Sequence, residues 1–326
     1  MKVSSIHLYE GIKYSSLSSF ADDTRLKNAI QNLMDSFKLQ QDLNHVYKWA
    51  SNNNMMLNGK KFEHIHYGKQ MESNSYFTEN SKVIKEKSLV SDLGIVLSDD
   101  TTFHHHINGV VKKATELVGW ILRTFRSRDK EVMITLWKSL VIPHLDYCSQ
   151  LWNPLEKGLI QSIEAVQRSF TRQIKDLKST NYWERLKKLN LYSLQRRRER
   201  YIIIYTWSIL EKQVPNIGGV DQGTEIGGIS CYFNARQGRK CHVPLIKRGA
   251  FQRKIYASFR MQGPKLFNCL PKKIRNLTKC TKNVFKQNLD KYLHTVPDEP
   301  LIPGYTNLRR ADTNSIPDMK ALVSTR

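Results

Sequence analysis

Two adjacent carboxylates near the amino terminus are the residues of this chain best suited to chemistry. Asp22 and Asp23 follow Phe20-Ala21 at the end of a β-prone stretch. Neighbouring side chains on a strand point to opposite faces, but in a hairpin turn both acids can face one metal-binding spot. Metal-assisted phosphoryl transfer needs such carboxylates to hold divalent ions about 3.5–4 Å apart. An isolated Asp-Asp pair is more often a solvated turn or a helix N-cap, so the surrounding sequence must decide.

Ordered motifs on both sides of the two acids supply that context. They are Glu10-Gly11-Ile12, Leu17–Thr24, Trp49-Ala50-Ser51-Asn52, Leu57-Asn58-Gly59-Lys60-Lys61, Asp92-Leu93-Gly94-Ile95, Phe103 with His106-Ile107, Trp137–Cys148, Leu151-Trp152-Asn153-Pro154, Phe259-Arg260 and Leu266–Pro271. In this order they resemble the reverse transcriptases of non-LTR (LINE-type, jockey-like) retrotransposons. The resemblance covers nearly the whole chain up to about Leu293.

The resemblance implies an RNA-directed DNA polymerase, a nucleotidyltransferase that binds an RNA template and a DNA primer. It implies that Asp22 and Asp23 are catalytic residues and ligands of Mg²⁺. It also implies that Lys61 is a palm lysine near the nucleotide phosphates, where a cation would stabilise the charge that develops during phosphoryl transfer. Leu93 and Gly94 would lie against the primer terminus, and Gly94 would allow close approach of the nucleic-acid backbone. An ordinary glycine in a core strand is the alternative.

The family's polymerase has fingers and an upstream palm strand with another metal-binding aspartate before the Asp-Asp hairpin. Only nineteen residues precede Phe20. We therefore expect a reverse transcriptase truncated at its amino terminus, with weak or absent Mg²⁺ binding, that binds nucleic acid but does not polymerise alone. Two alternatives stay open: an active polymerase completed by another chain, such as the missing upstream polymerase segment, and a non-catalytic relic without function.

Charge is distributed unevenly along the 326 residues. Residues 1–100 contain 12 Lys and Arg and 12 Asp and Glu, so residues 101–326 carry the entire net charge of +23. Such an excess favours binding to a phosphate backbone over a merely solubilising role or an anionic membrane surface. The cations that we expect to bind nucleic acid are Lys112, Lys113, Arg196, Arg197 and Arg200. On a helix, Arg196 and Arg200 share one face, so the cluster cannot all contact one row of phosphates.

Other kinds of site are not supported. The imidazoles of His104-His105-His106 diverge on any regular element, which argues against a metal site. None of the five cysteines has zinc-site spacing, and their number fits free thiols in a reducing compartment. The sequence has no run of eighteen apolar residues and no secretory pattern. We therefore expect an intracellular protein, nuclear or cytoplasmic and not secreted, without a membrane partner.

The hydrophobic pattern predicts an α+β fold that is mostly helical. We expect a partial reverse-transcriptase palm over 1–100, a helical thumb-like region over 101–180, and a basic region over 181–326 with glycine-containing loops and a disordered tail. Periodicity predicts helices over 24–50, 107–125, 130–150, from 156, from 194 and over 283–294. It predicts strands over 62–68 and 93–97, and loops over 69–88 and 215–250.

Overall fold

The computed structural model describes residues 8, 10–68, 75–215, 219–221, 224–226, 228–245, 256–300 and 314–324. The chain forms two compact units, Met1–Thr102 and Phe103–Arg326. It is a mixed, mainly helical fold with small sheets, in agreement with the predicted α+β class. Among the described residues, no helix combines the length and the apolarity that are needed to cross a membrane.

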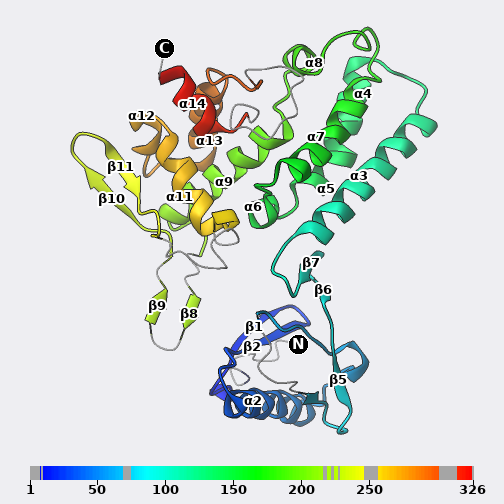
Figure 1. Cartoon of the computed structure of the whole chain (residues 1–326), viewed down its shortest axis with the longest axis vertical. Coiled ribbons are helices and arrows are strands. Elements are labelled where there is room, and N and C mark those ends of the chain that lie inside the picture. Colours follow the sequence, from blue (N-terminus) through cyan, green and yellow to red (C-terminus); the bar gives the residue numbers. More distant parts are fainter. Residues whose placement is uncertain are drawn as a thin grey trace. The chain divides into compact units, whose positions relative to one another are not determined.

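The first unit contains one long helix, a 3₁₀ turn and short strands. The strands are β1 (Ser16–Phe20), β2 (Asp23–Lys27), β3 (Glu63–His64), β4 (Tyr76–Phe77), β5 (Val83–Glu86), β6 (Leu89–Asp92) and β7 (Ile95–Ser98), and the helices are α2 (Leu33–Asn52) and η1 (Gly59–Lys61). Strands β1 and β2 form an antiparallel hairpin, as do β6 and β7, whereas β3, β5 and β4 form a three-stranded sheet in that order. Figure 1 shows α2 running alongside the β1–β2 hairpin.

Helix α2 positions the segments around it through polar side chains. Its buried Asp42 accepts hydrogen bonds from the backbone N–H groups of Lys13 (3.0 Å) and Tyr14 (2.9 Å), which anchors the chain just before β1. Gln40 donates to the carbonyl oxygen of Phe77 (3.0 Å) and accepts from its N–H (2.8 Å), which holds strand β4. The helix thus fixes both the approach to the first hairpin and the edge of the three-stranded sheet.

The second unit is built from helices with two short hairpins. The helices are α3 (His104–Thr124), α4 (Lys130–Leu136), the π-helical turn η2 (Trp137–Val141), α5 (Ile142–Asp146), α6 (Ser149–Trp152), α7 (Lys157–Thr171), α8 (Tyr182–Leu189), α9 (Leu194–Leu210), α11 (Phe259–Cys269), α12 (Lys272–Arg275), α13 (Lys282–Leu293) and α14 (Ile316–Ser324). The hairpins pair β8 (Gly219–Asp221) with β9 (Thr224–Ile226), and β10 (Cys231–Asn234) with β11 (Gly238–Cys241).

Helix α9 is the centre of this second unit. It contacts α6 and α7 as well as α11 and α13, so helices from both sides of residue 180 share contacts with it (Figure 1). The buried rings of Trp207 and Phe285 stack at 4.5 Å between α9 and α13. Trp137 and Phe170 stack at 4.9 Å and are fully buried.

The structure corrects several predicted elements. Residues 24–27 are strand rather than helix because they pair with β1, and α2 starts only after Asn32, whose side chain caps it by accepting the Asp35 N–H at 3.1 Å. The predicted strand over 62–68 shrinks to β3, and the predicted loop over 69–88 contains β4 and β5. The predicted loops over 215–250 contain hairpins.

Two further predictions concern proline-containing segments. The helix expected over 130–150 is divided into α4, the π-helical turn and α5, and Pro143 lies in the first turn of α5, directly after the π-helical turn. The tail expected to be disordered contains α14, whereas residues 301–313 lie outside the described residues.

Candidate functional site

The two candidate catalytic acids lie at the tip of a hairpin, as predicted. Strands β1 and β2 pair from Ser16 opposite Lys27 to Phe20 opposite Asp23, which leaves Ala21-Asp22 as a two-residue loop. Ala21 has φ of 53°, and a positive φ at the first loop residue is typical of two-residue hairpin loops. Asp22 therefore lies in the loop, Asp23 begins β2, and both residues are exposed.

Leu93 and Gly94 form the tip of a second hairpin. Strands β6 and β7 pair from Leu89 opposite Ser98 to Asp92 opposite Ile95. The two loop residues have φ of 46° and 79°, which matches the turn that favours glycine at its second position. Leu93 and Gly94 are thus turn residues rather than the start of the predicted strand over 93–97, and β7 begins at Ile95.

An ion pair connects the two hairpins. Nε of Arg25, two residues beyond Asp23, lies 2.9 Å from Oδ2 of Asp92, the residue that precedes the second turn. Burial and the Asp92 carboxylate raise the pKa of Tyr67, which therefore lies near the same carboxylate. A partly exposed pair such as this one contributes only about 0–1 kcal/mol, so it shows where β2 and β6 approach each other but adds little to stability. Asp92 belongs to one of the motifs named above, but its partners Arg25 and Tyr67 could not be predicted, because their association with Asp92 depends on the fold.

The two acids fit only part of a Mg²⁺ centre. Neither Asp22 nor Asp23 has a side-chain hydrogen bond or ion pair to a described residue, so both are available to a cation. A two-ion centre needs further oxygen ligands. No group of three or more His, Cys, Asp or Glu side chains with metal-binding geometry occurs in the described part of the chain.

Lys61 is hydrogen-bonded within its own turn rather than to the two acids. It ends η1, where its backbone N–H donates to the Asn58 carbonyl oxygen at 2.9 Å, and it is exposed. Within the described segments, no hydrogen bond or ion pair connects Lys61 to Asp22 or Asp23. The catalytic role that the resemblance implies for Lys61 therefore stays a prediction.

Lys112 and Lys113 lie on the exposed face of α3. The opposite face of this amphipathic helix is buried through Ile107, Ala114, Val118 and Ile121. Trp120, seven residues after Lys113 and so on the same side of the helix, is 45% exposed. Two cations and an exposed aromatic ring on one helix can contact a phosphate backbone and stack on a base.

The arginines of α9 point inward instead. Arg196 is fully buried and donates to the carbonyl oxygens of Val296 (3.0 Å), Pro297 (2.7 Å) and Asn314 (3.0 Å). Through these three hydrogen bonds, Arg196 attaches the segment after α13 and the residue Asn314 to helix α9. It cannot contact a nucleic acid at the surface while it occupies this position, contrary to the prediction.

Arg197 and Arg200 are each paired with a carboxylate. Arg197 donates to Asp146 through Nε (2.9 Å) and Nη2 (2.7 Å), which ties α9 to the end of α5. Arg200 donates from Nη2 to Asp290 of α13 at 2.7 Å. Two-pronged pairing of this kind is geometrically specific and leaves little charge for a phosphate. In the structure, both arginines therefore join α9 to neighbouring helices, and their contact with nucleic acid stays a prediction.

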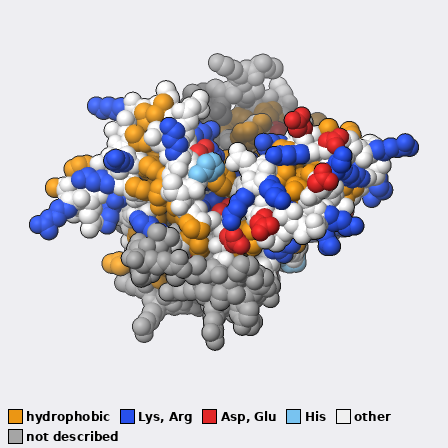
Figure 2. Space-filling model, turned by 90° about the horizontal axis from the view of Figure 1, so that it is seen from above, with side chains coloured by type: hydrophobic (Ala, Val, Ile, Leu, Met, Phe, Trp, Pro, Cys, Tyr) orange, Lys and Arg blue, Asp and Glu red, His pale blue; other side chains and the backbone are white. Residues whose placement is uncertain are grey.

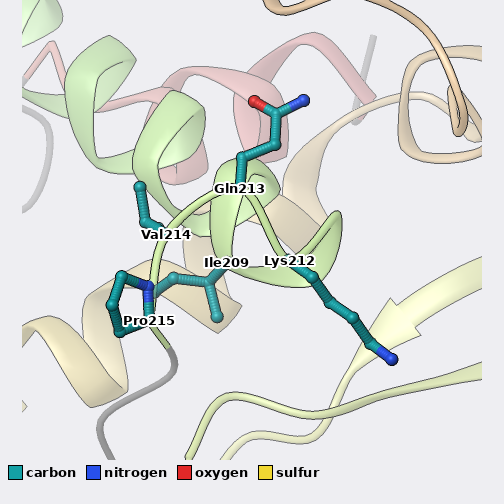
Figure 3. A pocket seen from close by; sticks show the side chains of 5 residues that line it. All are labelled: Ile209, Lys212, Gln213, Val214 and Pro215. Atoms are coloured by element: carbon teal, nitrogen blue, oxygen red, sulfur yellow. The ribbon is translucent and has the colours of Figure 1, made fainter.

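Two other places where a ligand could bind are the charged surface of the described residues and a pocket after α9. Among the described residues on the face shown in Figure 2, basic side chains are spread widely and interspersed with acidic and apolar ones, without gathering in one stripe. A shallow pocket after α9 is lined by Ile209, Lys212, Gln213, Val214 and Pro215. Figure 3 shows the polar ends of Lys212 and Gln213 extending away from each other, so this pocket has no converging polar groups.

Comparison with known proteins identifies relatives among mobile elements. Over 162 residues, or 48% of this chain, the sequence is 22% identical to the RNA-directed DNA polymerase from mobile element jockey of Drosophila melanogaster and 20% identical to that of Drosophila funebris. Each match covers 18% of the relative's length. An uncharacterized protein of Caenorhabditis elegans is 28% identical over 142 residues, which cover 42% of this chain and 72% of that protein.

No family model matches the chain, and no solved structure matches it. The jockey polymerases belong to the family that the motifs around Asp22 and Asp23 resemble. Over about half of its length, the chain is thus similar to the RNA-directed DNA polymerases of the mobile element jockey.

Proposed function

We propose that this chain carries the catalytic-aspartate hairpin and a nucleic-acid-binding surface of a non-LTR retrotransposon reverse transcriptase, and that it binds an RNA template with a DNA primer but does not polymerise by itself. The observation that carries the proposal is the pairing of two hairpin tips. The Asp22-Asp23 turn is joined through the Arg25–Asp92 ion pair to the Leu93-Gly94 turn. The similarity to jockey polymerases supports the same origin.

The ligand set among the described residues supports the proposal that the chain does not polymerise alone. Phosphoryl transfer with two divalent ions needs carboxylates that clamp both ions. Asp22 and Asp23 are the acids at this tip, and the described residues do not complete a three-ligand group with them. We therefore assign no catalytic step to this chain alone and expect weak or absent Mg²⁺ binding.

Binding to a primer–template is assigned to the lysines of α3. Lys112 and Lys113 are exposed, whereas the arginines of α9 are engaged inside the second unit. Phosphate contacts release counterions, so the logarithm of the binding constant should fall linearly with the logarithm of the salt concentration. Trp120 adds a ring on which an unpaired base can stack.

A salt titration with matched variants tests this assignment. Replacing Lys112 and Lys113 with glutamine should reduce the salt slope by roughly 0.9 for each lysine that contacts a phosphate. The control replaces Lys175 and Lys178, two exposed lysines of the same unit, which removes the same charge elsewhere. Equal slopes for both double variants would show that only net charge matters, and salt-independent binding would exclude a phosphate-backbone mode.

Primer extension tests the catalytic half of the proposal. With Mg²⁺ and an RNA template, the purified chain should not extend a DNA primer. Extension that disappears in the Asp22→Ala variant would overturn this expectation. A second candidate function, an active polymerase completed by another chain, is favoured by one observation: both acids are exposed and unbonded to described residues. It predicts aspartate-dependent extension once an upstream polymerase segment is added in trans.

The third reading, a relic without function, makes a separate prediction. Such a chain should bind a primer–template no better than an unrelated protein of equal charge, and the α3 lysines should be interchangeable with other surface lysines. Our main proposal also includes a location inside the cell, with RNA and DNA as the binding partners.

A further inference from the structure

Two cysteines face each other across the β10–β11 hairpin. Cys231 begins β10 and Cys241 ends β11, and the antiparallel register places them directly opposite each other. The hairpin projects from the second unit beside α11 and α12 (Figure 1). Both residues carry free thiols.

The hydrogen bonds show which kind of cross-strand pair this is. The N–H of His242 donates to the carbonyl oxygen of Ser230 at 3.0 Å, so the ladder bond lies one residue beyond the cysteines. The backbone of Cys241 points the other way: its N–H donates to Oδ1 of Asn268 (2.8 Å), and its carbonyl oxygen accepts from Nδ2 of Asn268 (2.9 Å). Cys231 and Cys241 therefore form a non-hydrogen-bonded pair.

This geometry permits a disulfide. In a non-hydrogen-bonded pair the Cα atoms are about 4.5 Å apart and both side chains extend from the same face of the hairpin. Disulfides need Cα atoms about 4.4–6.8 Å apart, so the strands would not have to move far. Most opposed pairs in a sheet serve packing alone, but Cys231 is exposed and has no part in a core.

The two thiols differ in accessibility and in charge environment. Cys231 is exposed, and Nε of Arg239, which extends from the same face of the hairpin, donates to its sulfur at 3.3 Å. The same guanidinium also pairs with Glu211 through Nη1 at 2.6 Å, so exposure is what chiefly distinguishes Cys231 from Cys241. Cys241 is only 2% exposed and belongs to the hydrophobic core of the second unit. Burial, reinforced by Cys231, raises the pKa of Cys241 to about 12 against the opposing effect of Arg239 and Arg275.

We propose that Cys231 and Cys241 are a thiol modification site that low-molecular-weight disulfides, such as oxidised glutathione, convert into a cross-strand disulfide. The Cys231 thiolate attacks one sulfur of the oxidant, forms a mixed disulfide and releases one glutathione thiolate. The Cys241 thiolate then attacks the sulfur of Cys231, forms the protein disulfide and releases the second glutathione thiolate. The two protein thiols lose two electrons, which reduce one glutathione disulfide, and their two protons pass to the two glutathione thiolates.

The asymmetry of the pair sets the order of these steps. The exposed Cys231 meets the oxidant first, because the oxidant cannot reach Cys241 in the core. The second step needs the thiolate of Cys241, whose raised pKa keeps it protonated near neutral pH. Conversion of the mixed disulfide into the protein disulfide should therefore become faster as the pH rises.

Peptide mapping tests the proposal on the full chain. After treatment with oxidised glutathione, free thiols are blocked, the protein is unfolded and trypsin cleaves after Arg236 and Lys240, which separates the two cysteines. The wild type should give a peptide pair joined through Cys231 and Cys241. The Cys241→Ser variant should instead accumulate glutathione on Cys231, and the Cys231→Ser variant should leave Cys241 unmodified.

A displaced cysteine supplies the matched control. Cys231→Ser combined with Tyr232→Cys moves the exposed thiol by one residue, to the opposite face of the hairpin. This variant should lose the disulfide to Cys241 and keep only a glutathione adduct on the new cysteine. Equal disulfide formation in this variant, linkage of Cys231 to Cys269 or Cys280, or an unreactive Cys231 in the folded wild type would each overturn the proposal.

Discussion

Replacing Arg196 with methionine tests whether the basic cluster of α9 supports the fold or binds a ligand. The guanidinium is fully buried and donates to three carbonyl oxygens, those of Val296, Pro297 and Asn314, at 2.7–3.0 Å. Its Nε also lies 3.8 Å from Oδ1 of Asp298. Methionine fills the space of the aliphatic stem but offers no donor, so three carbonyls and one carboxylate lose their cationic partner.

The expected cost follows from the loss of these partners. A hydrogen bond from a charged group contributes about 1.5–3 kcal/mol, and removal of one member of a buried charged pair costs about 3–5 kcal/mol. Burial already raises the pKa of Asp298 while Arg196 lowers it, so loss of Arg196 removes a compensating charge. Because carbonyls at the edge of the cluster can regain water, we expect the free energy of unfolding to fall by about 3–5 kcal/mol.

Urea unfolding followed by circular dichroism measures this change. The matched control is Arg123→Met, which removes an exposed arginine of α3 and should change the free energy of unfolding by no more than about 0.5 kcal/mol. Where the Arg196 variant remains folded, the salt slope of primer–template binding should equal that of the wild type. Unchanged stability together with a smaller salt slope would refute the structural role and restore Arg196 as a phosphate ligand.

Two further predictions concern titration and turn geometry. Burial raises the pKa of Glu199 from 4.5 to about 7, although Arg196 and the Ile316 N–H act in the opposite direction. The native state therefore binds this proton more tightly than the unfolded state does. The stability that Glu199 contributes falls as the pH rises from 4.5 through about 7. The amide oxygen of the Glu199→Gln variant can still accept the Ile316 N–H. Its free energy of unfolding in urea should match that of the wild type near pH 4.5 and exceed it by on the order of 1–3 kcal/mol at pH 8. A difference that does not change with pH would contradict this prediction. Gly94→Ala should destabilise the first unit by roughly 1–2 kcal/mol, because φ of Gly94 is 79° and alanine is strained there. The control is Gly109→Ala, at an exposed helical position, which should be neutral or stabilising. Amide hydrogen exchange in both variants measures the difference.

Local signals in the sequence were sufficient for several elements. The resemblance of the motif around Asp22 and Asp23, rather than a local signal, placed these acids at a turn, and the pairing of β1 with β2 confirms that position. The apolar spacing over 107–125 predicted α3 and its buried face. Helix α9 begins where expected, because Ser193 accepts the Arg196 N–H at 3.0 Å as an N-cap. For both helices the deciding interaction is between neighbours in the chain.

Predictions that depend on distant partners could not be made in this way. The segment after Asp23 has an apolar spacing compatible with a helix, but pairing with β1 makes it a strand. The orientation of the α9 arginines depends on Asp146 and Asp290, which lie 51 and 90 residues away from their partners. Helical periodicity identifies which residues share a face, but it does not reveal which face meets carboxylates and which meets solvent.

The direction of the arginines changes what the net charge of +23 means for binding. Much of the arginine charge in the second unit is directed to carbonyl oxygens or carboxylates within the unit. The arginines with such partners are Arg128, Arg185, Arg196, Arg197, Arg200, Arg239 and Arg275. Arginine is suited to this role because its planar fork satisfies several acceptors at once, whereas lysine is a hydrated point charge that stays at the surface.

If the chain binds a phosphate backbone as proposed, we expect exposed lysines to make most of the contacts, and we expect fewer phosphates to be contacted than the net charge suggests. The salt slope of the wild type counts these contacts directly. The α3 lysines then matter because of their position: they lie on a rigid, well-packed helix beside an exposed tryptophan, whereas Lys175 and Lys178 lie in the short segment between α7 and α8. The two double variants remove the same charge, at Lys112 and Lys113 or at Lys175 and Lys178. A difference between their salt slopes therefore measures the effect of position on the helix rather than of total charge.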